Sequence, residues 1–218
     1  MNLYKLHSDP ESLHKHDEAQ KTKPELIWEK YKNNPEELKK REDIISKDAE
    51  YSYQYARDIL KGPWPKGEDA ISKDAYISYL YARDVLDGPF SKGEDVISKN
   101  TSYSYHYAKD VLDASFPKGE NAISKDAYIS YLYAKNVLKG PFHKGEDAIS
   151  KDAEYSYLYA KNVLKWPWPK GEDSISKDPY YSYLYTRDIL KGPFPKGEEA
   201  ILNSGYADNY RNLIKDLK

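Results

Sequence analysis

The sequence contains no cysteine, only one methionine, and only four phenylalanines beside its 23 tyrosines. The lack of cysteine excludes disulfide bonds and thiolate metal ligands, and it is compatible with a reducing compartment. No run of about eighteen apolar residues is present, and residues 1–7 lack the apolar stretch of a signal peptide, so we expect no membrane span and a cytoplasmic location. The formal net charge is only −2, so no global field draws the chain towards nucleic acid or an anionic membrane.

A repeat of 26 residues organises most of the chain. The motif Glu-x-x-Ile-Ser-Lys recurs at this fixed interval and begins at Glu42, Glu68, Glu94, Glu120, Glu146 and Glu172. Six complete repeats therefore cover residues 42–197, and we number the positions of each repeat 1 to 26 from its first glutamate. We expect residues 1–41 to form an N-terminal segment with capping helices and residues 198–218 to form a C-terminal capping half-repeat.

Each repeat is predicted to contain a short helix and a longer helix. Position 7 is always Asp or Asn, whose side chains cap helix N-termini, and Pro179 follows Asp178 at the first helical position, where proline is tolerated. The longer helix then runs from position 8 to about position 20, and its apolar, aromatic and small residues fill an arc of about 200°. Because so wide an arc must be covered on more than one side, the pattern predicts an all-α solenoid of stacked two-helix repeats with polar capping ends.

Glycine and proline mark the loops and the N-terminal helices. The longer helix ends at a Gly-Pro-aromatic loop, but Ala114 and Trp166 replace its first glycine, so we expect no positive φ at position 21. The glycine at position 26 never changes, which indicates a left-handed or crowded backbone there. Before the repeats, Pro24 and Pro35 each start a helical segment, and the second is expected to lengthen the first helix of repeat 1.

The repeats have a recognisable form. The stretch from Tyr79 to Asp95 reads Tyr-x-Tyr-Ala-Arg-Asp-Val-Leu-x-Gly-Pro-Phe-x-Lys-Gly-Glu-Asp, and it resembles short, 26-residue helical repeats in proteins of bacteriophages and large DNA viruses. The resemblance covers about 170 residues, from repeat 1 to the end of the chain. It implies an α-helical stack in a viral or phage accessory protein that acts in the host cytoplasm. No biochemical activity is attached to this repeat type, so the resemblance carries no catalytic residue.

No catalytic, cofactor or metal site is expected. An enzyme needs unlike groups that converge on one point, whereas a regular stack offers the same group repeatedly. His106 and His143 have no partner that the sequence identifies, and the histidines at 7, 14 and 16 lack a known metal-ligand spacing. The recurring Glu-Asp pairs are interpreted as first-turn helix charges rather than as a cation-binding array.

The tyrosines at positions 12 and 14 allow two interpretations. They could stack on bases, but that mode also needs a basic track, and each repeat is close to neutral. Both positions lie within the wide apolar arc, so we interpret them as packing residues whose hydroxyl groups reach a partner or water.

Positions 9 and 13 lie one turn apart on the otherwise polar side of the longer helix, and they vary between repeats. A ridge of Tyr-Leu pairs would form an apolar contact surface, unless the short helix of a neighbouring repeat covers it. The candidate partner-binding residues are this ridge with one flanking arginine, namely Tyr76, Leu80, Arg83, His106, Tyr128, Leu132, Leu158, Tyr180 and Leu184.

The leading functional hypothesis is a non-enzymatic helical-repeat protein that binds another protein through this ridge. The viral resemblance makes the expected partner a host component, for example one of host defence. Two alternatives remain open from the sequence. One is a nucleic-acid or nucleotide binder that uses the repeated tyrosines, and the other is a self-assembling structural protein whose ridge pairs with itself.

Overall fold

A computed structural model describes residues 23–216, and these residues form helices joined by loops and no strand. The described chain is an all-α helical-repeat solenoid, so the predicted fold class is confirmed. The described residues divide into two compact units, residues 23–96 and residues 97–216, which we call the N-terminal and C-terminal units. His7, His14 and His16, which were considered as metal ligands, lie outside the described residues.

The N-terminal unit begins with two helices that start at proline, α2 (Pro24–Tyr31) and α3 (Pro35–Lys39). The prediction that the second segment lengthens the first helix of repeat 1 is wrong, because α3 ends at Lys39 and a separate helix follows. Arg41 breaks the continuity: its backbone leaves the helical region at φ −120°, and its guanidinium donates to the carbonyl oxygen of Glu37 at 2.6 Å.

Every repeat starts with one turn of α-helix over positions 1–4, which places two acidic or amide side chains at the helix N-terminus. These short helices are α4 (Glu42–Ile45), α6 (Glu68–Ile71), α8 (Glu94–Ile97), α10 (Glu120–Ile123), α12 (Glu146–Ile149) and α14 (Glu172–Ile175).

The longer α-helix of each repeat begins at position 8, as predicted. These helices are α5 (Ala49–Gln54), α7 (Ala75–Tyr81), α9 (Thr101–His106), α11 (Ala127–Leu132), α13 (Ala153–Tyr159) and α15 (Pro179–Tyr185). The Asp or Asn at position 7 accepts a hydrogen bond from the backbone N–H of position 10 in all six repeats, at 2.8–3.1 Å. The predicted N-caps are therefore confirmed.

The longer helix does not stay α-helical to its end. It widens into a π-helix over five or six residues, in η1 (Tyr55–Leu60), η2 (Ala82–Leu86), η4 (Tyr107–Leu112), η5 (Tyr133–Leu138), η7 (Ala160–Leu164) and η9 (Thr186–Leu190). Each π-helix ends at a left-handed residue at position 20, with φ between 45° and 65°, and that residue is Lys or Asp rather than glycine. The pattern of apolar residues does not predict this change from α-helix to π-helix. A single π-turn rotates the apolar face by only a fraction of a turn, so the pattern still fits an α-helix.

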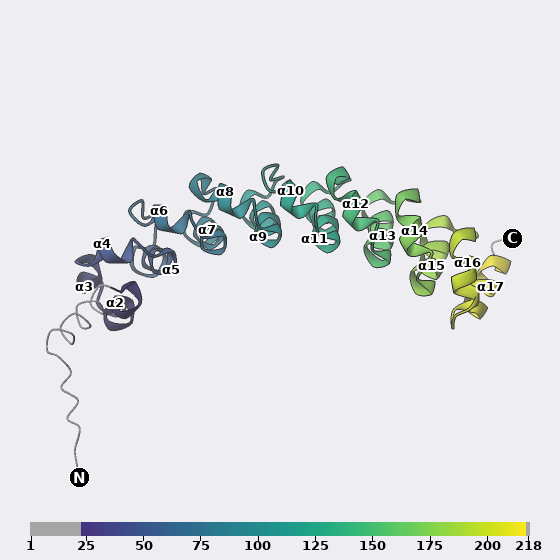
Figure 1. The fold of residues 1–218 in the computed structure, drawn as a ribbon, viewed down its shortest axis with the longest axis horizontal. Coiled ribbons are helices and arrows are strands. Elements are labelled where there is room, and N and C mark those ends of the chain that lie inside the picture. The colour runs from purple at the N-terminus through teal and green to yellow at the C-terminus, as the bar shows by residue number, and fades with distance from the viewer. Residues whose placement is uncertain (1–22, 217–218) are drawn as a thin grey trace, which may run out of the picture. The chain divides into compact units, whose positions relative to one another are not determined.

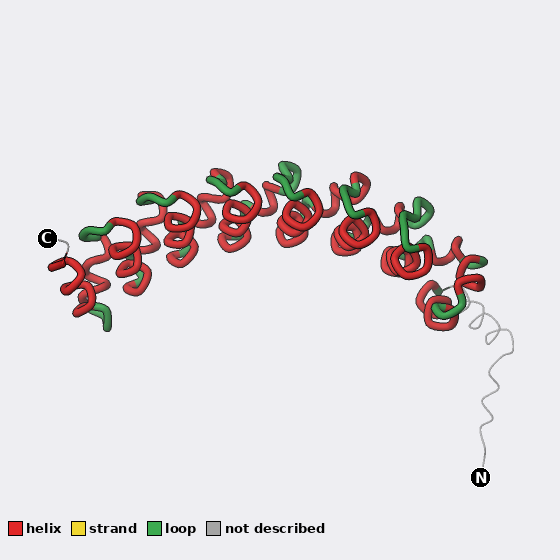
Figure 2. Tube along the Cα trace, turned by 180° about the vertical axis from the view of Figure 1, so that it is seen from behind, coloured by secondary structure: helices red, strands yellow, loops and turns green. Residues whose placement is uncertain are grey.

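Three loops contain a 3₁₀ turn, in η3 (Ser91–Gly93), η6 (His143–Gly145) and η8 (Pro169–Gly171). The chain ends with α16 (Pro195–Leu202) and α17 (Ala207–Asp216). In the C-terminal unit the longer helices α11, α13 and α15 lie side by side in chain order, with the short helices as a second layer (Figure 1). The loops between these repeats gather on one edge of that unit (Figure 2).

The tyrosine at position 14 forms the centre of the core. It is fully buried in all six repeats, as Tyr55, Tyr81, Tyr107, Tyr133, Tyr159 and Tyr185. The Tyr133 hydroxyl accepts the backbone N–H of Phe116 from the preceding repeat at 2.8 Å and donates to Glu120 at 3.4 Å. Its ring meets Phe142 edge-on, with 5.0 Å between the ring centroids. One side chain therefore joins two repeats and fixes the loop of its own repeat.

The tyrosines at position 12 are also packing residues in most repeats. Tyr53, Tyr79, Tyr105, Tyr131 and Tyr157 are 3–5% exposed, which confirms their interpretation as core residues. The described part of the chain contains no buried side-chain nitrogen or oxygen without a hydrogen-bond partner. The hydroxyl groups of these tyrosines are thus satisfied, as expected for a core with so many polar rings.

The invariant glycine at position 26 is crowded rather than left-handed. No described glycine has a positive φ. A Cβ atom on Gly145 would lie 2.5 Å from the Phe142 ring and 2.6 Å from the Ser130 hydroxyl oxygen. The glycine lets the loop close over position 11, where the Ser130 hydroxyl donates to the Ile123 carbonyl oxygen at 2.9 Å.

Gly145→Ala should destabilise the protein by about 1–3 kcal/mol, because the added methyl group overpacks this contact. Gly140→Ala is the matched control, since its Cβ would meet nothing closer than the Leu138 carbonyl oxygen at 3.7 Å and Ala114 occupies the same position in repeat 3. Urea denaturation of both variants measures the difference. Equal stabilities would contradict the crowding argument.

The protein should lose stability steeply above pH 10. Burial, with the nearby Glu68 and Glu120 carboxylates, raises the pKa of Tyr81 and Tyr133 to about 12. The unfolded chain releases these protons near pH 10 while the folded chain retains them, so their contribution is complete below pH 10 and is lost as the pH rises towards 12. Tyrosinate absorbance and circular dichroism, followed together, should show cooperative unfolding. Ionisation of all tyrosines near pH 10 without unfolding would contradict the buried network.

Candidate partner-binding face

The tyrosines at position 9 are exposed. Tyr76, Tyr128 and Tyr180 have 47%, 48% and 44% of their surface accessible, which is unusual for aromatic residues of this fold. Position 9 is the second residue of the longer helix, in the first turn of α7, α11 and α15. The other repeats have Glu50, Ser102 or Glu154 here, so the apolar surface recurs in alternate repeats.

The leucines at position 13 do not form an exposed ridge with these tyrosines. Leu80 and Leu184 are buried, at 9% and 8% exposure, and Leu132 and Leu158 are half-buried. Leu80 and Leu184 are therefore removed from the candidate contact residues. A helical wheel does not show how close the neighbouring helices come, and α15 is covered by α16.

Within the C-terminal unit, tyrosine rings meet across successive repeats. Tyr128 contacts Tyr155 of the next repeat, with ring centroids 5.4 Å apart, and Tyr131 stacks on the same ring at 6.2 Å. Tyr180 lies 5.5 Å from Tyr206, whose ring is nearly parallel to that of Tyr183. Each exposed tyrosine thus rests on a second ring, which limits its conformational freedom and favours a preformed contact surface.

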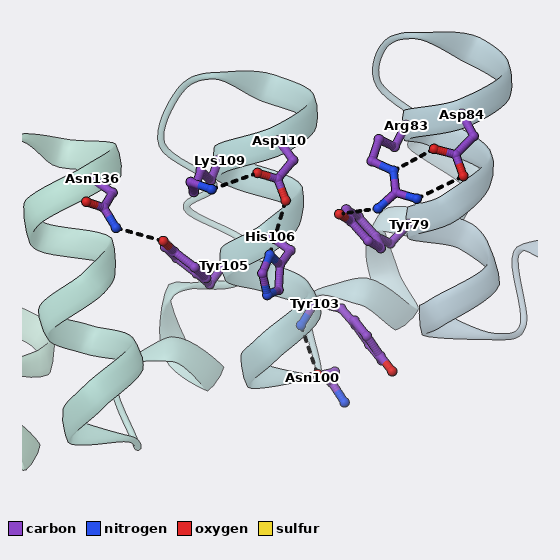
Figure 3. A network of polar contacts seen from close by, with 10 residues as sticks. All are labelled: Tyr79, Arg83, Asp84, Asn100, Tyr103, Tyr105, His106, Lys109, Asp110 and Asn136. Carbon is purple, nitrogen blue, oxygen red and sulfur yellow. Dashed lines mark hydrogen bonds and ion pairs between the residues drawn. The ribbon is translucent and has the colours of Figure 1, made fainter.

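Arg83 is exposed but held by neighbours on its own helix (Figure 3). Its guanidinium donates to the Tyr79 hydroxyl at 2.9 Å, lies 5.0 Å from the centroid of that ring, and pairs with Asp84. The hydrogen bond from Arg83 holds the pKa of Asp84 below its usual range. Asp84 also accepts from the Tyr53 hydroxyl of repeat 1 at 2.6 Å. Arg83 therefore belongs to a link between repeats as well as to the surface.

His106 is half-buried and also engaged within its helix (Figure 3). Its Nδ1 atom lies 3.1 Å from a carboxylate oxygen of Asp110, and Lys109 contacts the other oxygen of that carboxylate at 3.1 Å. The His106 side chain thus contributes a polar contact at a position where most repeats have leucine.

The residue at position 17 links the repeats in two chemically different ways. Where it is Asp, as in Asp84 and Asp188, its carboxylate accepts from the tyrosine at position 12 of the preceding repeat. Where it is Asn, the donor direction reverses. Asn136 donates to the Tyr105 hydroxyl oxygen at 2.8 Å (Figure 3), and Asn162 donates to the Tyr131 hydroxyl oxygen at the same distance. The same link therefore forms with or without a negative charge.

Neither a metal centre nor a membrane segment can be assigned to the described residues. Residues 23–216 contain no group of three or more histidine and acidic side chains that could hold a metal ion. None of the helices in this part of the chain has the length and apolar character needed to cross a membrane.

Trp166 is an exposed aromatic residue that the sequence analysis did not select. Its exposure of 58% is larger than that of any position-9 tyrosine. It was identified only as a departure at position 21, where four repeats have glycine. The replacement of glycine by tryptophan could have indicated an exposed residue, because a loop that is built around glycine has no buried space for an indole.

No protein-family model, curated protein or solved structure matches this chain significantly.

Asp188→Asn should leave the fold intact and reduce its sensitivity to acid. The hydrogen bonds from Arg187, Lys161 and Tyr157 hold the pKa of Asp188 below its usual value, so this group stabilises the folded state above about pH 4 and its contribution is lost as the pH falls further. At neutral pH the cost should stay below about 1 kcal/mol, because asparagine makes the same link in repeats 4 and 5.

Urea denaturation of the natural chain and of Asp188→Asn at several pH values between about 2 and 5 measures this effect. Parallel stability curves for the two proteins would show that Asp188 does not contribute to acid sensitivity.

Proposed function

We propose that this chain is a non-enzymatic helical-repeat protein that binds another protein through the exposed tyrosines at position 9. The observation that carries the proposal is the exposure of Tyr76, Tyr128 and Tyr180 at one repeat position of an otherwise uniform scaffold. Tyrosine provides a large, rigid, amphipathic contact area and is enriched among the residues that dominate interface energies.

The geometry of the C-terminal unit specifies what such a partner would present. Tyr128 and Tyr180 are two repeats apart, which corresponds to about 20 Å for neighbouring helices packed 8–10 Å apart. Between them lies Glu154, and burial together with a hydrogen bond to this carboxylate raises the pKa of Tyr181 to about 12. A complementary surface would therefore offer two apolar or aromatic pockets that flank a hydrogen-bond donor.

The resemblance to phage and viral repeats extends the proposal to the identity of the partner. On that basis the partner is a host component, such as a defence protein, that meets this chain in the host cytoplasm. The rival function of nucleotide binding by the repeated tyrosines is less favoured, whereas self-assembly through the same face is an outcome of the test below. Most tyrosines at positions 12 and 14 are buried and lack an open ring face.

The double variant Tyr128→Glu, Tyr180→Glu should lose partner capture while keeping the fold, because Glu occupies position 9 in repeats 1 and 5. Removal of two interface aromatics should weaken binding at least about tenfold. The measurement is affinity capture from host cells, followed by calorimetric titration with the purified partner.

Ser102→Glu is the matched control, because it introduces the same residue at position 9 of repeat 3 and removes no ring. Undiminished partner binding by the double variant would refute this assignment of the face. A mass that rises with concentration in light scattering, and that falls in the double variant, would instead favour self-assembly.

A further inference from the structure

An open pocket of about 390 Å³ lies at the π-helical ends of repeats 4 and 5. Its charged lining consists of Lys135 and Lys139 from repeat 4 and Lys165 from repeat 5, and no carboxylate is among the described residues that line it. Trp166 forms part of the same wall, with 58% of its surface exposed. The volume falls within the range of small-molecule sites.

The charge of this pocket is a local property of repeats 4 and 5. At the corresponding place between repeats 1 and 2, Asp84 occupies position 17 and Asp87 occupies position 20. Repeats 4 and 5 have asparagine at position 17 and lysine at position 20 instead. Within the described part of the chain, Lys135, Lys139 and Lys165 form no ion pair, whereas the arginine of repeat 2 pairs with Asp84.

Folding does not require these substitutions. Asn162 keeps the link to Tyr131 that an aspartate would make, at 2.8 Å, but removes the negative charge from the pocket wall. A lysine at the C-terminal end of a helix interacts favourably with the helix dipole, yet Asp87 and Asp113 occupy the same left-handed position in repeats 2 and 3. The stack therefore tolerates either charge at position 20.

Trp166 likewise has no packing role that explains it. Four repeats have glycine at position 21, and the neighbouring Trp168 already fills the aromatic position of this loop, where it is 7% exposed. The Lys135 ammonium group lies over the Tyr131 ring, 5.6 Å from its centroid, and none of the three lysines has an ion-pair partner among the described residues. An exposed indole that lines the same pocket as these lysines combines a stacking surface with a high local density of positive charge.

We infer that this pocket binds a nucleotide, with the base stacked on Trp166 and a phosphate group held by Lys135, Lys139 and Lys165. Lysine binds phosphate as a point charge, and an exposed aromatic side chain stacks on any base, so the two features match the two parts of a nucleotide. An acidic peptide would satisfy the lysines but has no planar group next to each charge. The nucleotide is either a free mononucleotide or one unit of a single strand.

A single-stranded nucleic acid could extend from this pocket into a neighbouring one. A second pocket of about 360 Å³ shares Lys165 and adds Lys191, although there Lys161 pairs with Asp188 at 2.8 Å. This site is separate from the position-9 tyrosines, because positions 9 and 20 lie about 16 Å apart along the longer helix.

Trp166 fluorescence provides a direct measurement. The other three tryptophans, Trp28, Trp64 and Trp168, are buried, so quenching by a stacked base reports on Trp166. The probes are adenosine monophosphate, an oligothymidylate of about ten nucleotides, inorganic phosphate and a glutamate-rich peptide. We expect quenching by a nucleotide, and for the oligonucleotide a slope of about −0.7 in log affinity against log salt, as one neutralised phosphate predicts.

Substitutions that copy residues from other repeats of this chain are expected to preserve the fold. Trp166→Gly, and the double variant Asn162→Asp, Lys165→Asp, introduce residues that other repeats already have at these positions. Each should reduce the affinity for a labelled oligonucleotide about tenfold or more, measured by fluorescence anisotropy. Gly88→Trp is the matched addition. It places an indole at position 21 of repeat 2, where Asp84 and Asp87 stand in place of Asn162 and Lys165 and offset the positive charge, and it should create no site.

The outcomes are distinct. Binding of the mononucleotide identifies a free nucleotide as the ligand, and binding of the oligonucleotide alone identifies a single strand. The inference is overturned if neither quenches Trp166, if phosphate or the acidic peptide binds as tightly, or if the variants bind unchanged. The Tyr128→Glu, Tyr180→Glu protein should bind the nucleotide normally, so failure of the protein-binding proposal leaves this one testable by itself.

Discussion

The hydroxyl group of the tyrosine at position 14 joins three parts of the stack at once. In repeat 4 it accepts a backbone N–H from the preceding loop and donates to the first glutamate of its own repeat, while its ring packs on its own loop. Phenylalanine would fill the same space but would leave the buried loop N–H without an acceptor. The excess of tyrosine over phenylalanine in the composition follows from this requirement, because the core needs large rings that also satisfy polar groups.

A scaffold held by such internal links leaves other positions free to vary. Position 17 makes its link to the preceding repeat as either Asp or Asn, and position 20 adopts its left-handed conformation as either Lys or Asp. Charge can therefore change from one repeat to the next without loss of the stack. The two candidate sites use this freedom at opposite ends of the longer helix, with aromatic rings at position 9 and a basic pocket at positions 16 to 21.

The sequence predicted correctly those features in which a single residue type has a single local role. Asp126 caps its helix and Gly145 lies in a crowded contact, as their invariant types and positions indicated. The sequence did not decide whether Leu184 lies on an exposed ridge or under a neighbouring helix, and the structure shows that Leu184 is buried. A helical wheel places a side chain on one helix only, and it contains no information on how close the neighbouring helices come. The wheel also assumes one turn geometry, whereas the longer helices change from α to π near this position.

The amino-acid sequence by itself determined the helical repeat, its 26-residue period and the starts of its helices, because caps, prolines and apolar periodicity act within a few residues of the chain. The tertiary structure decided which varied side chains remain accessible. Tyr128 and Trp166 are exposed while Leu80 is buried, although all three occupy positions that vary between repeats. Exposure and the shape of a pocket depend on residues brought together from different repeats, and no local pattern specifies those distances.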